Sequence, residues 1–171
     1  LAYLGKARIN MQLDVGFADV VTPEPKTQQV PTILPQFAAP VVRVYPPPTI
    51  VAEKFQAMVD LGMMNSRLKD FYDVWFLSEN VEFSFSELKL AVHNTFIHRQ
   101  TEIPSETPIA LTADFAITKQ VQWNALIRKN HLDDAPADFS EVLILLQRFL
   151  VPICLGSDEG LLQWVPGRGW G

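Results

Sequence analysis

The sequence has few of the residues that build disulfide frameworks, metal clusters and phosphate loops. Its 171 residues include one cysteine, three histidines and eight glycines. Cys154 cannot form an internal disulfide, which is typical of a reducing compartment such as the cytoplasm. It lies in the apolar run RFLVPICL, so we expect a small buried hydrophobe rather than a nucleophile or metal ligand. We find no glycine-rich phosphate loop, zinc-ligand cluster or nucleophile elbow, which argues against the enzyme classes that those motifs define.

Excess positive charge and long apolar runs are also missing. The formal net charge of −5 argues against a protein whose main work is to coat nucleic acid, although a local basic patch remains compatible with it. Residues 142–155 are apolar but are interrupted by Gln147, Arg148 and Pro152, so they predict a core helix rather than a membrane span. We find no signal peptide and expect no membrane partner. Apolar residues make up 48% of the chain, enough for the core of one domain or of a small domain plus part of another.

The first part of the chain predicts β-structure. Residues 7–17, ARINMQLDVGF, alternate apolar and polar side chains with period two, as a half-buried strand does. Residues 22–48 hold eight of the thirteen prolines and read as a loop, with a short edge strand in PVVRVY near its end. Two strands are too few for a stable sheet, so we expect another chain or further strands to complete it.

The rest of the chain predicts a helical bundle. Helical spacing and capping signals indicate five helices, at about 50–63, 67–77, 84–99, 113–129 and 139–153. Thr49, Ser66 and Ser84 are the predicted N-caps, the last with Glu87 at capping-box spacing. The fold class is therefore α+β, divided into a β-region with its proline-rich loop at 1–48, a helical domain at 49–157 and a tail at 158–171. The tail contains QWVPGRGWG, which has no period and is predicted to be loosely held.

Lys54 lies among the apolar positions of the first predicted helix. It is one turn from Ile50 and one turn from Met58, at the centre of the apolar stripe. Its stem could cover apolar surface while its ammonium group reaches water. Alternatively, the ammonium group points at an anion in a cleft, because burying it without a partner would be costly.

The next helix carries a narrow charged strip in SRLKDFYDVWFL. Asp70 and Asp73 are three residues apart and share a helix face, with Arg67 one turn before Asp70 and Lys69 one turn before Asp73. Aromatic residues cover much of the remaining circumference. The strip is either a solvated face with weak local ion pairs or one wall of a cleft.

Asp14 and the histidines are weaker signals. Asp14 lies on the polar face of the first predicted strand, where an acidic residue is disfavoured, so it is either a solvent-facing carboxylate or a metal ligand. His93 and His98 are five residues apart, a spacing that does not suit a shared metal ion on a helix. We interpret both of them, and His131, as structural or surface residues.

Three segments taken together are similar to one known family. They are QLDVGFADVVTP, YPPPTIVAEKFQAMVDLGMMNSRLKDFYDVWFL and TFIHRQTEIPSETPIALTADFAITKQVQWNALIRK. From about Gly5 to Leu155 the chain resembles the AbiEii/AbiGii nucleotidyltransferase toxins, which belong to the polymerase-β-like nucleotidyltransferase superfamily. The resemblance implies metal-dependent transfer of a nucleotide from an NTP to an acceptor such as tRNA. It also implies a type IV toxin–antitoxin system with an antitoxin partner, and a role in phage defence.

The resemblance gives roles to the residues singled out above. It implies two Mg²⁺ ions, held partly by a strand carboxylate that matches Asp14. Its triphosphate-binding lysine matches Lys54, and its KD..D motif matches Asp70 and Asp73. One of these aspartates is expected to orient the attacking group or to hold the lysine. The expected catalytic residues are Asp14, Asp70 and Asp73, the expected nucleotide-binding residues are Lys54, Arg67 and Lys69, and the expected metal ligand is Asp14.

The sequence departs from the family at one motif. A Gly-Ser turn followed by an Asp-x-Asp pair, which would carry further metal ligands, does not occur in these residues. The nearest matches, Asp133–Asp134 and Gly156-Ser157-Asp158, come after the helices. We therefore expect the motif to precede Leu1, so that the chain is the C-terminal part of a family member with the remnant of a nucleotidyltransferase sheet, inactive by itself.

Two other functions remain open from the residues alone. The helical bundle could be a non-catalytic remnant that binds a partner. A helical nucleic-acid reader is less consistent with the sequence, because no helix carries a basic stripe. The basic residues that could contact a nucleic-acid acceptor are scattered: Arg8, Arg43, Arg67, Lys69, Arg99, Lys119, Arg128 and Lys129.

Overall fold

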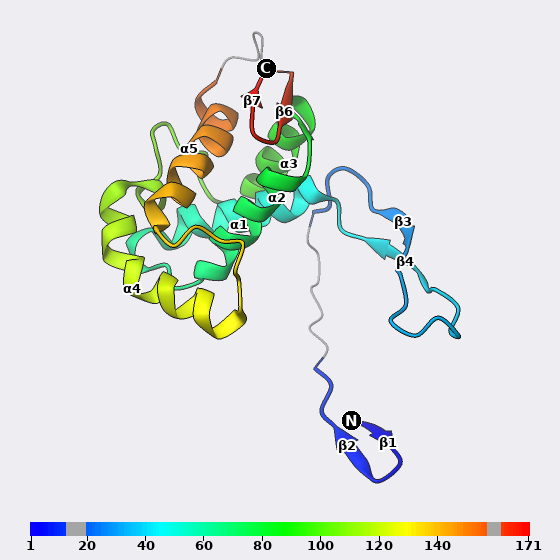
Figure 1. Ribbon diagram of the computed structural model, residues 1–171. Helices are drawn as coiled ribbons and strands as arrows, with labels where there is room; N and C mark the ends of the chain where they lie inside the picture. The colour runs from blue at the N-terminus through cyan, green and yellow to red at the C-terminus, as the bar shows by residue number, and fades with distance from the viewer. Residues whose placement is uncertain (13–19, 157–161) are drawn as a thin grey trace.

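The computed structural model describes residues 1–12, 20–156 and 162–171, and its fold is α+β, as predicted. Figure 1 shows a helical body with a short sheet at one end, and two hairpins outside this body that are formed by the N-terminal part of the chain. The helices of the described residues are α1 (Pro47–Leu61), α2 (Leu68–Asn80), α3 (Phe85–His98), α4 (Ala113–Asn130) and α5 (Phe139–Leu155). Short 3₁₀ turns, η1 (Gly62–Met64) and η2 (Ile109–Leu111), follow α1 and precede α4.

The strands of the described residues form three small antiparallel sheets. β1 (Ala2–Leu4) pairs with β2 (Ala7–Ile9), and β3 (Lys26–Gln29) pairs with β4 (Val41–Val44). The third sheet has the order β5-β6-β7 and joins β5 (Phe83–Ser84), β6 (Gln163–Val165) and β7 (Gly169–Trp170).

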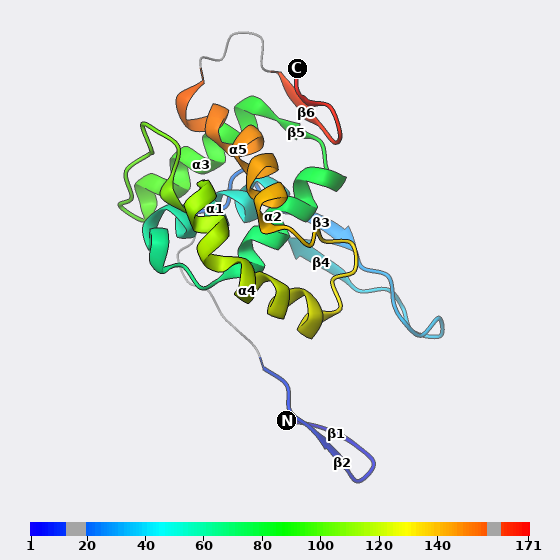
Figure 2. The same ribbon diagram turned by 60° about the vertical axis from the view of Figure 1, so that its left-hand side comes forward.

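The predicted strand at 7–17 is wrong in extent and in burial as far as the structure describes it. Its strand residues are Ala7–Ile9, residues 10–12 are irregular, and residues 13–17 lie outside the described part. Ile9 and Met11, expected on a buried face, are 47% and 65% exposed. The reason is that β2 pairs with β1 in a hairpin that lies away from the helical body in both views (Figures 1 and 2).

The edge strand predicted in PVVRVY is confirmed as β4, but the loop before it contains a strand that the sequence did not reveal. β3 has the sequence KTQQ, which lacks apolar alternation, and it is defined by backbone pairing with β4. The two strands form an arm that projects from the body in Figure 2.

The five predicted helices are confirmed with small shifts at their ends, but two of the three predicted N-caps are wrong. α1 begins at Pro47 with prolines in its first two positions, where a missing N–H costs nothing. The hydroxyl of Thr49 instead donates to the carbonyl of Thr22 and accepts from its amide, at 2.7 and 2.9 Å. α2 begins after Arg67, and Ser66 is exposed. Ser84 caps α3 by accepting from the amide of Glu87, as predicted.

The prediction of a loose tail is contradicted for residues 162–171. Trp164 is 1% exposed, its indole donates to the carbonyl of Ser78 at 2.7 Å, and its ring lies 4.8 Å from that of Phe149. The indole of Trp170 donates to the Phe149 carbonyl at 3.0 Å. Two aromatic side chains therefore fix this segment against the helices, which outweighs its lack of a sequence period.

Candidate functional site

The turn between α1 and α2 brings the predicted site residues together. Gly62 ends α1 with φ 46°, a conformation that suits glycine. Asn65 follows and is fully buried: its amide donates to the carbonyl of Ala57 at 3.3 Å, and its side-chain oxygen accepts from the amide of Arg67 at 2.8 Å. These bonds fasten the start of α2 to α1, so the charged strip of α2 lies beside Lys54.

Lys54 bridges both aspartates of the strip. Its ammonium nitrogen donates to Asp70 Oδ1 at 2.6 Å and to Asp73 Oδ2 at 2.8 Å. One cation reaches both carboxylates because residues three apart on a helix lie on adjacent turns of one face. The Lys54 side chain is 22% exposed, which places its ammonium group between two helices rather than in open water.

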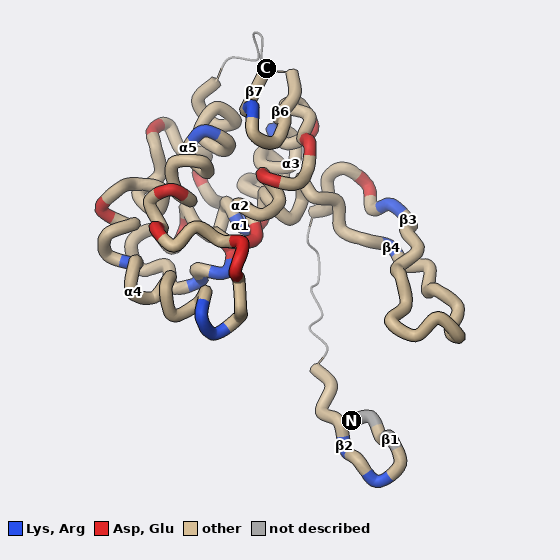
Figure 3. The backbone as a smooth tube through the Cα atoms, in the orientation of Figure 1, with Lys and Arg blue, Asp and Glu red and all other residues tan. Residues whose placement is uncertain are grey.

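Arg67 and Lys69 form an outer layer around this pair of carboxylates. Arg67 Nε lies 2.8 Å from Asp70 Oδ2, and Lys69 Nζ lies 2.6 Å from Asp73 Oδ1. Both basic side chains are more than 60% exposed. The strip therefore has local ion pairs on its outer side and an interhelical contact with Lys54 on its inner side, whereas its role as one wall of a cleft stays a prediction. Figure 3 shows charges of both signs gathered where α1 and α2 meet.

The cluster keeps Lys54 protonated and leaves one carboxylate oxygen incompletely satisfied. Burial by itself lowers the pKa of Lys54, but the hydrogen bonds and negative charges of Asp70 and Asp73 outweigh it, so the pKa is raised above its ordinary value. Asp70 Oδ2 is buried and, among the described residues, accepts no hydrogen bond; its contact with Arg67 Nε is an ion pair. Three cations face two carboxylates, so the cluster carries one excess positive charge.

Tyr72, on the same helix, contacts Asp134, a residue that the sequence analysis did not place at this site. The hydroxyl of Tyr72 donates to Asp134, at 3.0 and 3.1 Å from its two carboxylate oxygens. Burial, and then the bond to Asp134, raise the pKa of Tyr72. Asp134 lies 62 residues away in the chain, and no local pattern in the sequence could have indicated this contact.

A second polar network lies on another side of α1 and involves Arg99. Gln56 is buried and donates to the hydroxyl of Thr101 at 2.7 Å, and its side-chain oxygen accepts from Arg99 at 3.0 Å. Arg99 also donates to the carbonyl of Glu53 at 3.4 Å. Arg99 is one of the basic residues that the sequence suggested for contact with a nucleic-acid acceptor, but in the structure it joins the end of α3 to α1. Its partners on α1, Glu53 and Gln56, flank Lys54 in the sequence.

The described residues do not fit a Mg²⁺ site. Within residues 1–12, 20–156 and 162–171 there is no group of three or more His, Cys, Asp and Glu side chains that could hold a metal ion. The carboxylates of Asp70 and Asp73 already face cations, which compete with a metal for the same oxygens. Asp14, the expected metal ligand, lies outside the described residues, so its role stays a prediction.

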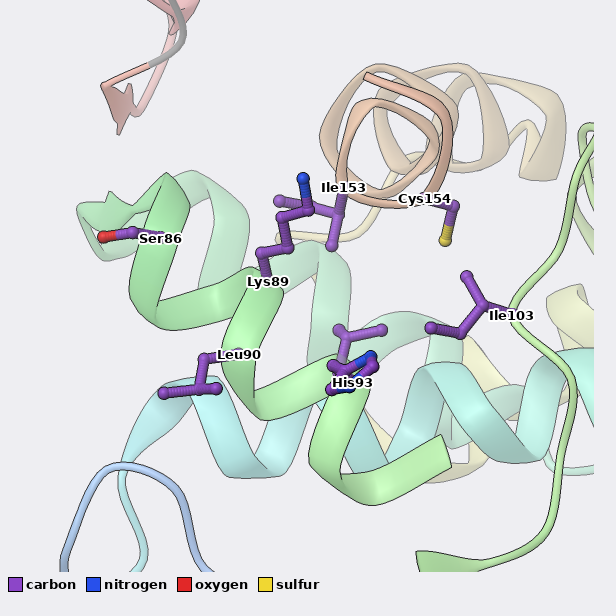
Figure 4. Close-up of a pocket in the computed structure, with 8 residues that line it drawn as sticks. Ser86, Lys89, Leu90, His93, Ile103, Ile153 and Cys154 are labelled. Carbon is purple, nitrogen blue, oxygen red and sulfur yellow. The ribbon is translucent and has the colours of Figure 1, made fainter. Parts of the chain in front are cut away.

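Cys154 lines a hollow of about 380 Å³ between α3, α5 and the loop at Ile103. Figure 4 shows its sulfur directed toward Ile103, with His93 on the facing helix. Burial raises the pKa of the Cys154 thiol to about 12, so little thiolate forms at neutral pH. This agrees with the expectation that Cys154 is a small hydrophobe, although the residue is half-buried rather than fully enclosed.

Comparisons with known proteins bear on the whole cluster. A protein-family model described as "Nucleotidyl transferase AbiEii toxin, Type IV TA system" matches residues 1–144. A search of the curated proteins and a search of the solved structures gave no match. The matched range contains Lys54, both aspartates, and the network of Arg99 and Gln56. In the described part of the chain, none of the helices is long and apolar enough to cross a membrane.

Proposed function

Because the chain belongs to the AbiEii nucleotidyltransferase toxin family of type IV toxin–antitoxin systems, we propose that it binds the triphosphate of a nucleotide at the Lys54 cluster. The observation that supports this most directly is the position of the Lys54 ammonium group between Asp70 and Asp73. A lysine that leaves an apolar helix face to meet two carboxylates of a neighbouring helix is held in one orientation. Such a cation is ready to receive phosphate oxygens without first being ordered.

The outer cations suit the same ligand. Arg67 and Lys69 are exposed and can turn from their aspartates toward an incoming polyphosphate. The two aspartates compensate Lys54 in the absence of nucleotide, because an unpaired ammonium group at that depth would be costly. The excess positive charge of the cluster favours an anion over a neutral ligand.

The contacts favour one of the two roles expected for the aspartates. Asp70 Oδ1 holds the ammonium group of Lys54, so Asp70 serves as the residue that positions the phosphate-binding lysine. In the transfer expected from the family, a hydroxyl oxygen of the acceptor attacks the α-phosphorus, the bond to pyrophosphate breaks, and pyrophosphate leaves with the electron pair. The hydroxyl proton passes to a base or to water. Positioning and charge neutralisation carry such reactions.

The remaining parts of the proposal rest on the family. We expect the acceptor to be a nucleic acid such as tRNA, an antitoxin to accompany the protein, and the pair to act in the cytoplasm in phage defence. Magnesium dependence is also expected from the family, with Asp14 as a ligand. The described donor set supplies no Mg²⁺ site, so binding of the phosphates by Lys54, Arg67 and Lys69 should persist within a few fold when EDTA is added.

Nucleotide binding by calorimetry tests the proposal. The chain should bind each of the four ribonucleoside triphosphates and inorganic tripolyphosphate, and Lys54→Met should abolish binding. Lys119→Met is the matched control, since Lys119 lies over the ring of Phe115 on α4 and should bind as the unchanged protein does. Absence of binding by the unchanged chain, or equal binding by Lys54→Met, overturns the proposal.

One observation favours a second function, the non-catalytic binding of a protein partner. The arm formed by β3 and β4 carries large apolar side chains on its surface, with Ile33 98% and Phe37 61% exposed. Exposed apolar residues of this size are typical of interaction surfaces. If this is the function, the chain binds none of the phosphate probes.

A further inference from the structure

The charged cluster continues along α2 into an aromatic surface that the proposed phosphate site does not use. Lys69 Nζ, which pairs with Asp73, also lies 5.9 Å from the ring centre of Tyr72. The ring of Tyr72 in turn lies 6.0 Å from that of Phe76 and 5.8 Å from that of Trp75. A continuous series of contacts therefore leads from the cations to the rings.

The geometry of the helix places Phe76 on the same face as Lys69. Residues seven apart complete about two turns of an α-helix, so the two side chains are separated by roughly 10 Å along its axis. Phe76 is 41% exposed, which is unusual for a large aromatic side chain of a helix that packs into the core. Tyr72 is partly buried, and its hydroxyl is fastened to Asp134, so the ring next to Phe76 is held in place.

We propose that Phe76, supported by Tyr72, is the surface on which the base of the bound nucleotide stacks. The inference rests on the proposed function, because it takes the phosphates to lie at Lys54, Arg67 and Lys69. The axial separation leaves room for a sugar between phosphates at Lys69 and a base at Phe76. Every nucleobase has a flat π-face, so such a platform accepts all four bases and strengthens binding without reading base edges.

Two probes separate the contribution of the base from that of the phosphates. The four ribonucleoside triphosphates have both parts, whereas inorganic tripolyphosphate has phosphates alone. Phe76→Ala should weaken the binding of each nucleotide roughly tenfold, in line with the loss of one stacked base, and should leave the affinity for tripolyphosphate unchanged. Phe76→Tyr retains a ring and should bind nucleotides within about twofold of the unchanged protein.

Phe37→Ala is the matched control, because Phe37 is an exposed phenylalanine on the arm of β3 and β4. It should affect neither probe. If Phe76→Ala leaves nucleotide affinity unchanged, or weakens tripolyphosphate and nucleotides equally, the stacking surface is wrong while the phosphate site stands. If the unchanged protein binds neither probe, the phosphate site fails, and the stacking surface fails with it.

Discussion

The two aspartates of the cluster differ in how much they depend on Lys54. Asp70 has a side chain only 7% exposed, and its Oδ1 depends on the ammonium group of Lys54. Asp73 is 24% exposed and has both Lys54 and the flexible Lys69 as partners. Loss of charge at the buried position should therefore cost more free energy of folding than the same change at the exposed one.

We expect Asp70→Asn to lower the free energy of unfolding by about 1–3 kcal/mol, because the partly buried Lys54 loses its closer partner. Asp73→Asn, the matched control, should lower it by less than about 1 kcal/mol, as partly exposed ion pairs contribute little. Urea denaturation at pH 7 measures both changes. Equal losses, or a larger loss for Asp73→Asn, would show that burial does not set the strength of these contacts.

The raised pKa of Lys54 predicts a stability effect at high pH. Its pKa in the folded protein lies above the ordinary value of 10.5, so the stabilisation from its pairing is complete below that pH and is lost as pH rises through the folded pKa. The difference in unfolding free energy between the unchanged protein and Lys54→Met should therefore be constant from pH 7 to about 10 and shrink above it. Urea titrations at several pH values measure this difference. A difference that grows above pH 10 would contradict the pairing.

For helices and strands, the sequence predicts correctly those features that a local pattern of residues determines. The five helices follow from apolar spacing, and Ser84 is a correct N-cap because its signal lies within four residues of its partner. Thr49 fails as a cap because its hydroxyl binds Thr22, 27 residues away. β3 and Trp164 were missed for the same reason, since pairing and burial against distant residues decide their structure.

For the candidate site, too, local sequence patterns indicate some features, whereas contacts between distant residues decide the others. Lys54, Asp70 and Asp73 could be singled out because a lysine on an apolar stripe and a charged strip among aromatics are local anomalies. Their meeting in space depends on the turn at Gly62 and Asn65. The contact of Tyr72 with Asp134 depends on the path of the chain between α4 and α5, which no short pattern contains.

The packing of the β5-β6-β7 sheet against the helices can be tested by substituting Trp164. Trp164→Ala should lower the free energy of unfolding by about 3–5 kcal/mol, because it removes a fully enclosed indole together with its bond to Ser78. Leu162→Ala is the control, since Leu162 is 75% exposed, and it should change stability by less than about 0.5 kcal/mol. Thermal or urea denaturation measures both. A small effect at Trp164 would restore the sequence-based prediction of a loose tail.

For the whole molecule, binding and transfer are separable. Residues 1–171 contain the Lys54 cluster but no Gly-Ser turn followed by Asp-x-Asp. We therefore expect this chain to bind nucleotide without transferring it, and an assay with radiolabelled NTPs and a tRNA acceptor should show no incorporation. Clear incorporation would mean that the catalytic carboxylates lie elsewhere in these residues. The binding measurements on Lys54→Met would still stand in that case.

The enclosed indole of Trp164 also bears on how the protein is made. Its neighbours Phe83 and Phe149, whose ring centres lie 5.1 Å apart, belong to segments that leave the ribosome earlier, and the side of Phe149 that packs against Trp164 stays uncovered until residues 163–170 emerge. During synthesis the helices can form and pack together, but the apolar surface that Trp164 later covers stays exposed to solvent. Chaperones that recognise such surfaces would therefore meet the nascent chain before residues 163–170 emerge, and the arrival of the Trp164 ring would cover the apolar surface that they bind.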